Sequence, residues 1–196
     1  MNTPAHAVAN LLILGRKGKP HLAWPIVAGA ILPDVPMFVF YAVVKLGERL
    51  PEREIWSHAY YRPGWQAVFD GFHSLPLIAL CLLVAWRLGA ERWTALFASM
   101  ALHVPEDFFL HHEDGHRHFF PFSDWRFASP VSYWDPAYHG TLIGGLEALM
   151  VIFGSLFLWR RYEARFVRAA IAAVGGLYAL FFVFALVTWA DGLAAN

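Results

Sequence analysis

The sequence contains few charged residues and a single cysteine. Charged side chains make up 15% of its 196 residues, whereas a soluble domain carries about 25%. Cys81 has no second cysteine to pair with, which excludes a disulfide-built secreted domain. The 15 basic side chains are balanced by 15 acidic ones, which excludes a basic nucleic-acid binder, and the 58% of hydrophobic residues excludes a disordered chain.

Apolar and aromatic residues are abundant instead. Aromatic residues make up 17% of the chain, and the mean hydropathy is +0.44. Because a bilayer core needs about 20 mainly apolar helical residues, we expect five membrane spans, at about 22–44, 75–86, 93–110, 141–159 and 169–190. The sequence therefore predicts an all-α, polytopic membrane bundle in which residues 1–196 form a single domain.

Two further segments lie outside these spans. Thr3-Pro4 is typical of a helix start and predicts an N-terminal helix to about Leu14, with His6 and Asn10 on one polar stripe. Residues 111–140 form a long connection rich in histidine and aromatic residues, and ordered loops of this length are often functional. A small excess of Lys and Arg in alternate loops favours a cytoplasmic N-terminus.

Imidazole and carboxylate groups stand inside or beside several of the apolar segments. An ionisable group within a span costs about 2.5–3.5 kcal/mol, so each one is a functional candidate. His103 and Asp107 are spaced i, i+4 and share a helix face, and Asp34 lies in a proline-flanked break of the first span. Together with His6 and His73 they form a set of three histidines and two aspartates, which suits Zn²⁺ or a similar divalent ion.

Each of these residues also has a purely structural interpretation. His103 and Asp107 can form a buried ion pair, and Asp34 can cap a half-helix. His6 can lie at the membrane interface, and His73 with the following serine can cap the second span. Each alternative is acceptable for one residue, but all of them together on so apolar a background are hard to explain by packing alone.

The connection adds candidates for acid–base chemistry. Residues 111–118 contain four histidines and two acids, from which we expect His112, His116 or Arg117 to stabilise developing charge or to protonate a leaving group. A solvated loop is the alternative, although the aromatic residues that follow favour a packed one. Asp70, one helical turn before His73, is expected to act as general base or to orient that histidine. Glu147, in the fourth span, is interpreted as a proton carrier, a ligand or the partner of an arginine.

The order of these motifs resembles a known family. The resemblance is carried by His6, Leu32-Pro33-Asp34, Phe69-Asp70-Gly71-Phe72-His73-Ser74, His103-x-x-x-Asp107, and the tract that runs from His111-His112-Glu113-Asp114-Gly115-His116-Arg117-His118 to Ser132-Tyr133-Trp134-Asp135-Pro136. The sequence is similar to the membrane-bound metal-dependent hydrolases, a family of bacterial inner-membrane proteins, over about residues 1 to 140. That family is distantly similar to the all-helical zinc-dependent phospholipase C and nuclease group.

The resemblance implies a function and a ligand set. It makes His6, Asp34, His73, His103 and Asp107 the ligands of one or two divalent ions, with zinc preferred. It implies a multi-pass protein of the bacterial inner (cytoplasmic) membrane whose partners are the bilayer and a lipid or lipid-linked substrate. The expected reaction is hydrolysis of a phosphoester or ester bond by water that the metal activates. We expect no nucleic-acid partner.

Two other functions stay open at this stage. A di-iron oxidase related to membrane desaturases is suggested by His112-x-x-x-His116, although the remaining histidine boxes of such enzymes are missing. A non-catalytic metal-binding or haem-binding membrane subunit is the other, with His73, His103 and His139 as candidate axial ligands. Buried aspartates count against haem, because an apolar haem pocket gains nothing from them.

Overall fold

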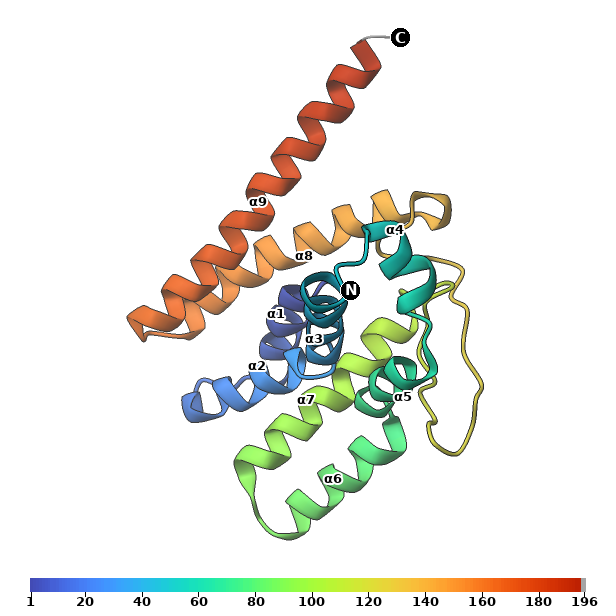
Figure 1. Ribbon diagram of the computed structural model, residues 1–196. Coiled ribbons are helices and arrows are strands. Elements are labelled where there is room, and N and C mark those ends of the chain that lie inside the picture. The colour runs from blue at the N-terminus through green and yellow to red at the C-terminus, as the bar shows by residue number, and fades with distance from the viewer. Residues whose placement is uncertain (195–196) are drawn as a thin grey trace.

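The regular structure is helical throughout the part of the chain described, as Figure 1 shows. The computed structural model describes the backbone of residues 1–194 and the side chains of residues 1–188. The α-helices are α1 (Thr3–Leu14), α2 (Ala23–Ile31), α3 (Val35–Ala42), α4 (Glu52–Glu54), α5 (Pro63–Phe72), α6 (Leu75–Arg87), α7 (Glu91–Phe108), α8 (Gly140–Arg161) and α9 (Arg165–Ala194). Short 3₁₀ or π segments occupy Pro20–Leu22, Val43–Gly47, Ile55–Ala59 and Pro136–Tyr138. The expected all-α class is confirmed.

Prolines interrupt the first expected span. Pro33 and Pro36 flank the break between α2 and α3, where the two helices bend by 53°. A proline ring cannot continue the hydrogen bonding of the helix that precedes it, so the chain starts a new helix here. Asp34 lies in this break and is therefore held at a helix junction in the interior.

A second break separates α5 from α6. These helices bend by 40° at His73 and Ser74. The side chain of Ser74 accepts a hydrogen bond from the backbone N–H of Leu77, which makes Ser74 the cap of α6. His73 ends α5 and lies at the bend, at the level of the break in the first expected span.

A glycine lets α2 approach α7 closely. A Cβ atom on Gly29 would lie 2.1 Å from the carbonyl oxygen of Leu96 and 2.8 Å from the Cβ of Ser99, so only glycine fits at this crossing. The neighbouring residue, Ala30, is fully buried against the same helix. This close contact brings the main chain of α2 next to the histidine of α7.

The N-terminal helix α1 lies at the centre of the bundle, between α2 and α8 (Figure 1). Its end at Leu14 is as expected, although Asn2 and not Thr3 occupies the capping position. The polar stripe of α1 faces α7, because the amide of Asn10 donates to the main chain and side chain of Ser99. His6, one turn earlier, points at the far end of α7.

Within the described residues, two helices, α8 and α9, are long and apolar enough to cross a membrane, and the bent pairs α2–α3 and α5–α6 raise the number to at most four. The expected third span, 93–110, corresponds to α7, which is outside this set. It carries four charged residues within its 18, at Glu91, Arg92, Glu106 and Asp107. In α9 only 6% of the apolar stretch is buried, so its side chains face outward.

Candidate metal centre

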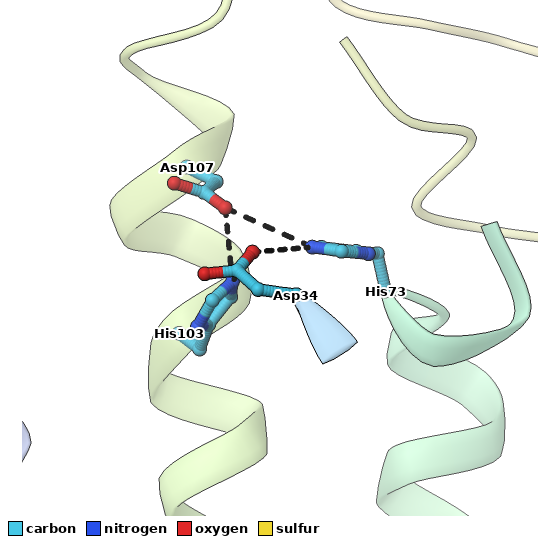
Figure 2. Close-up of side chains that lie close together, drawn as sticks. All are labelled: Asp34, His73, His103 and Asp107. Atoms are coloured by element: carbon cyan, nitrogen blue, oxygen red, sulfur yellow. Dashed lines mark ion pairs between the residues drawn. The ribbon is translucent and has the colours of Figure 1, made fainter. Parts of the chain in front are cut away.

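Four of the five expected ligands converge on one point. Asp34, His73, His103 and Asp107 each direct one ligand atom inward, and these atoms lie within 4.8 Å of one another. Figure 2 shows the two residues of α7 facing Asp34 and His73, which come from the two helix breaks. All four residues are buried. We call this set the Asp/His quartet.

The separations within the quartet match those of ligands around one metal ion. Nε2 of His103 lies 2.9 Å from Oδ2 of Asp107 and 3.6 Å from Oδ1 of Asp34. Nε2 of His73 lies 3.7 Å from the same Asp107 oxygen and 4.0 Å from the same Asp34 oxygen. Tetrahedral zinc ligands at their usual bond lengths are about 3.4 Å apart, within this range.

Both histidines are oriented by the main chain. Nδ1 of His73 lies 2.9 Å from the carbonyl oxygen of Phe69, and Nδ1 of His103 lies 2.8 Å from that of Ala30. A proton on Nδ1 satisfies each carbonyl and leaves Nε2 with its lone pair free, as in protein zinc sites. Within the described residues, both Nε2 atoms are buried without an assigned hydrogen bond, although that of His103 lies close to an oxygen of Asp107. The quartet therefore fits a divalent ion.

The two carboxylates are held from their other side. The hydroxyl of Thr3 donates to Oδ2 of Asp34 at 2.5 Å. Nε2 of His6 lies 3.0 Å from Oδ1 of Asp107, while Nδ1 of His6 lies 2.7 Å from Glu106. The ring of His6 also stacks on His103, with centroids 3.7 Å apart. His6 thus lies beside the quartet but outside it, and its role as a ligand stays a prediction.

A cavity of about 910 Å³ opens beside the quartet. Asp34, His73 and Asp107 line it, and most of the remaining wall is apolar or aromatic, including Tyr60 and Phe69. A cavity of this size is in the usual range for ligand sites, which combine an apolar wall with a few converging polar groups. The quartet therefore provides the polar end of an otherwise apolar site.

The long connection contributes two histidines to the same cavity. His116 stacks on His73 with ring centroids 3.8 Å apart, and burial together with the nearby His73 lowers the pKa of His116 to about 3. His111 lies between two carboxylates, with Nε2 3.5 Å from Asp107 and Nδ1 3.0 Å from Asp114. Burial opposes its charge, but these carboxylates prevail and raise the pKa of His111 to about 9. Two imidazoles whose pKa values are shifted in opposite directions thus face the cavity.

Asp70 is engaged by two arginines of the connection. Its Oδ1 accepts the backbone N–H of Arg117 at 2.9 Å, and its Oδ2 accepts Nε of Arg117 at 2.5 Å and a nitrogen of Arg126 at 3.4 Å. The side chain is fully buried and does not line the cavity. Oδ1 of Asp70 also lies 3.8 Å from Nδ1 of His116. The expected role of Asp70, as general base or as the residue that orients His73, stays a prediction.

His112 and Arg117 lie away from the cavity. Nδ1 of His112 lies 2.5 Å from the carbonyl oxygen of Ser129, and its ring stacks on Tyr138 at 3.5 Å. Arg117 bridges Asp70 to Asp124. The structure therefore does not bring His112 and His116 together as the iron-binding box that the oxidase hypothesis requires.

Sequence reasoning did not single out His111 or Thr3. The signal for His111 was present, because His103, Asp107 and His111 continue one i, i+4 series. Because His111 was interpreted as one member of a loop tract, this helical spacing was overlooked. Thr3 carried no comparable signal, since its contact with Asp34 depends on how α1 packs against the break after α2.

Comparison with known proteins identifies the family. The model of the YdjM inner membrane protein family matches residues 3–191, and the chain belongs to this family. No curated protein and no solved structure matches it. The match supports the inner-membrane location expected from the sequence, and its description names neither a hydrolase nor zinc.

Proposed function

We propose that this member of the YdjM inner membrane protein family is a metal-dependent hydrolase. It cleaves a phosphoester or ester bond of a lipid or lipid-linked substrate, with one or two divalent ions, zinc first, held by the Asp/His quartet. The observation that carries the proposal is the pair of buried Nε2 atoms of His73 and His103, which face two carboxylates at the wall of a cavity. Such an ion supplies an acidified water and a Lewis acid for the scissile oxygen.

The residues around the quartet divide the remaining tasks. His116, at the cavity wall and stacked on His73, is placed to accept a hydrogen bond from a reacting group. His111, held between Asp107 and Asp114, is placed to stabilise negative charge that develops on a substrate oxygen. Asp70 and Arg117 act indirectly, because they fix the connection that carries both histidines.

The wall of the cavity supports an amphiphilic substrate. Nine of its lining residues are methionine, phenylalanine, tyrosine or tryptophan: Met1, Met37, Phe38, Trp56, Tyr60, Tyr61, Phe69, Tyr133 and Trp134. A small water-soluble substrate gains little from such a wall, whereas a lipid gains free energy from every apolar area it covers. The apolar α8 and α9 keep the whole site at the membrane.

Metal analysis tests the site and the reaction in turn. Protein purified in detergent under metal-replete conditions is compared with His103→Ala and with His58→Ala, whose side chain is 72% exposed. We expect zinc or manganese at a stoichiometric level in the wild type and in His58→Ala, with hydrolysis of a lipid phosphoester, and neither metal nor hydrolysis in His103→Ala. Equal metal content in all three proteins would refute the site. Metal-loaded protein without any hydrolysis of phosphoesters or esters would refute the reaction, and bound iron with oxygen consumption would favour an oxidase.

A further inference from the structure

A second cavity, of about 810 Å³, lies between α8 and α9. The two helices meet at the turn after Arg161, and Figure 1 shows them diverging from that turn. The cavity occupies the diverging part, between the first turns of α8 and the stretch of α9 from Tyr178 to Leu186, roughly 12 Å of helix. Its walls are mostly apolar or aromatic and include leucine and phenylalanine side chains such as Leu146 and Phe181. We call this cavity the slot.

The slot adjoins the cavity beside the quartet. Asn2, Tyr133 and Trp134 line both. A single elongated molecule can therefore have a polar end at Asp34 and His73 and an apolar end between α8 and α9. Most of α9 faces outward, so the slot is also accessible from the bilayer.

The one charged residue that lines the slot within the described side chains is already satisfied. Glu147 accepts hydrogen bonds from the backbone N–H and the side-chain amide of Asn2, at 3.1 and 2.8 Å, and from the hydroxyl of Tyr178 at 2.9 Å. This carboxylate ties the start of α1 to α8 and α9, and it is not bound to an arginine. Its oxygens are engaged by the protein, so the slot offers an incoming molecule an apolar surface.

Glycines make room for this surface. Gly140, Gly144 and Gly145 line the slot on the α8 side, and a Cβ atom added to Gly145 would meet nothing within 4 Å. Larger residues at this position would fit the fold but would occupy the slot. The small residues therefore maintain a volume that the packing of α8 against α9 leaves empty.

We propose that the slot binds an acyl chain of the lipid whose ester group lies at the quartet. The inference rests on the proposed function and narrows it to an acylated amphiphile with its chain between α8 and α9 and its headgroup between Asp34 and His116. A soluble phosphoester or a substrate with a bulky carbohydrate in place of the chain would leave the slot empty. The chain makes its contact through methylene groups, so its binding should depend on chain length.

The preference of the protein for a long acyl chain over a short one tests directly whether the slot binds the chain. Binding of palmitoyl lysophosphatidylglycerol and of its hexanoyl analogue is titrated by native mass spectrometry on detergent-purified protein, with metal content measured in parallel. The variant Gly145→Leu fills the slot. Gly176→Leu is the matched control, because Gly176 is also a helical glycine with open space around its Cβ position but lines neither cavity.

We expect the wild type and Gly176→Leu to prefer the palmitoyl probe and Gly145→Leu to lose that preference. The affinity of Gly145→Leu for the palmitoyl probe should fall roughly tenfold, the loss that corresponds to about two methylenes leaving the slot. Its affinity for the hexanoyl probe and its metal content should be unchanged. Ala185→Phe, from the opposite wall, should reproduce the effect and guards against misfolding of the first variant.

Two outcomes overturn the inference. If Gly145→Leu and Ala185→Phe discriminate between the probes as the wild type does, the palmitoyl chain binds elsewhere on the apolar surface. If Gly176→Leu loses the preference equally, the effect comes from the helix pair as a whole and not from the slot. Binding is read without turnover, so a wild type that prefers the palmitoyl probe but contains no metal contradicts the proposed function and leaves the slot standing.

Discussion

One histidine of the long connection, His112, contrasts with the two histidines of the quartet. His73 and His103, at a helix end and within a helix, each use one nitrogen on a main-chain carbonyl and keep the other free at the quartet. His112, in the connection, uses Nδ1 on Ser129 and lies away from the cavity. All three rings use Nδ1 on a main-chain carbonyl, so the comparison teaches that the place of the remaining Nε2 atom decides whether an imidazole can serve as a ligand or as a packing group. Histidine content alone does not distinguish the two.

A cluster of charged residues holds the long connection in place. The contribution of Asp70 to this cluster can therefore be measured separately from the contribution of the quartet. Asp70→Asn keeps the shape of the side chain but removes the charge that binds Arg117 and Arg126. Breaking a buried pair of this kind costs about 3 kcal/mol of unfolding free energy. We expect a lower melting temperature in detergent and faster tryptic cleavage after Arg117 and Arg126, with the metal of the quartet retained.

The matched control for this change is Asp124→Asn. Asp124 also pairs with Arg117, but its side chain is 90% exposed, and exposed pairs contribute little. We expect its melting temperature and cleavage pattern to equal those of the wild type. If both variants behave alike, the connection is held by its aromatic packing and not by Asp70.

A smaller effect is expected where the N-terminal helix supports the quartet. Thr3→Val removes the hydroxyl that donates to Asp34 and keeps the volume of the side chain. Loss of such a supporting hydrogen bond lowers metal affinity by about 10–100-fold. Competition for zinc between the purified protein and a chelator measures this affinity.

Thr94→Val is the corresponding control. The hydroxyl of Thr94 donates only to the carbonyl oxygen of Ala90 in its own helix. Its substitution should leave zinc affinity unchanged. An unchanged affinity in Thr3→Val as well would mean that the helical frame alone aligns Asp34.

Part of the quartet could be predicted from local spacing in the sequence. The i, i+4 interval fixes the shared face of His103 and Asp107, and the prolines around Asp34 place it at a break in an apolar helix. We expect these residues to converge with His73, because an ionisable group that stays unpaired among apolar residues costs free energy. Local periodicity was sufficient for His103 and Asp107, whereas the approach of Asp34 and His73 depends on how helices far apart in the sequence pack together.

The roles within the connection could not be predicted in the same way. The segment has no helical period, so the direction of each side chain depends on contacts with residues far along the chain, such as that of Arg117 with Asp70, 47 positions earlier.

The number of membrane spans did not follow from hydropathy for a related reason. α7 looks like a span in its middle, but its charged ends and its histidine serve the interior of the bundle.

The smallest effect should come from the packing histidine itself. The substitution His112→Phe keeps an aromatic ring next to Tyr138 and removes the contact with the carbonyl oxygen of Ser129. One such hydrogen bond contributes about 1 kcal/mol, which corresponds to a fall of about 2–4 °C in melting temperature for a chain of this length. Metal content and hydrolysis should stay at the wild-type level, because His112 does not line the cavity. Loss of hydrolysis with full metal content would return His112 to the catalytic role expected from the sequence, and would mean that the connection moves toward the quartet when substrate binds.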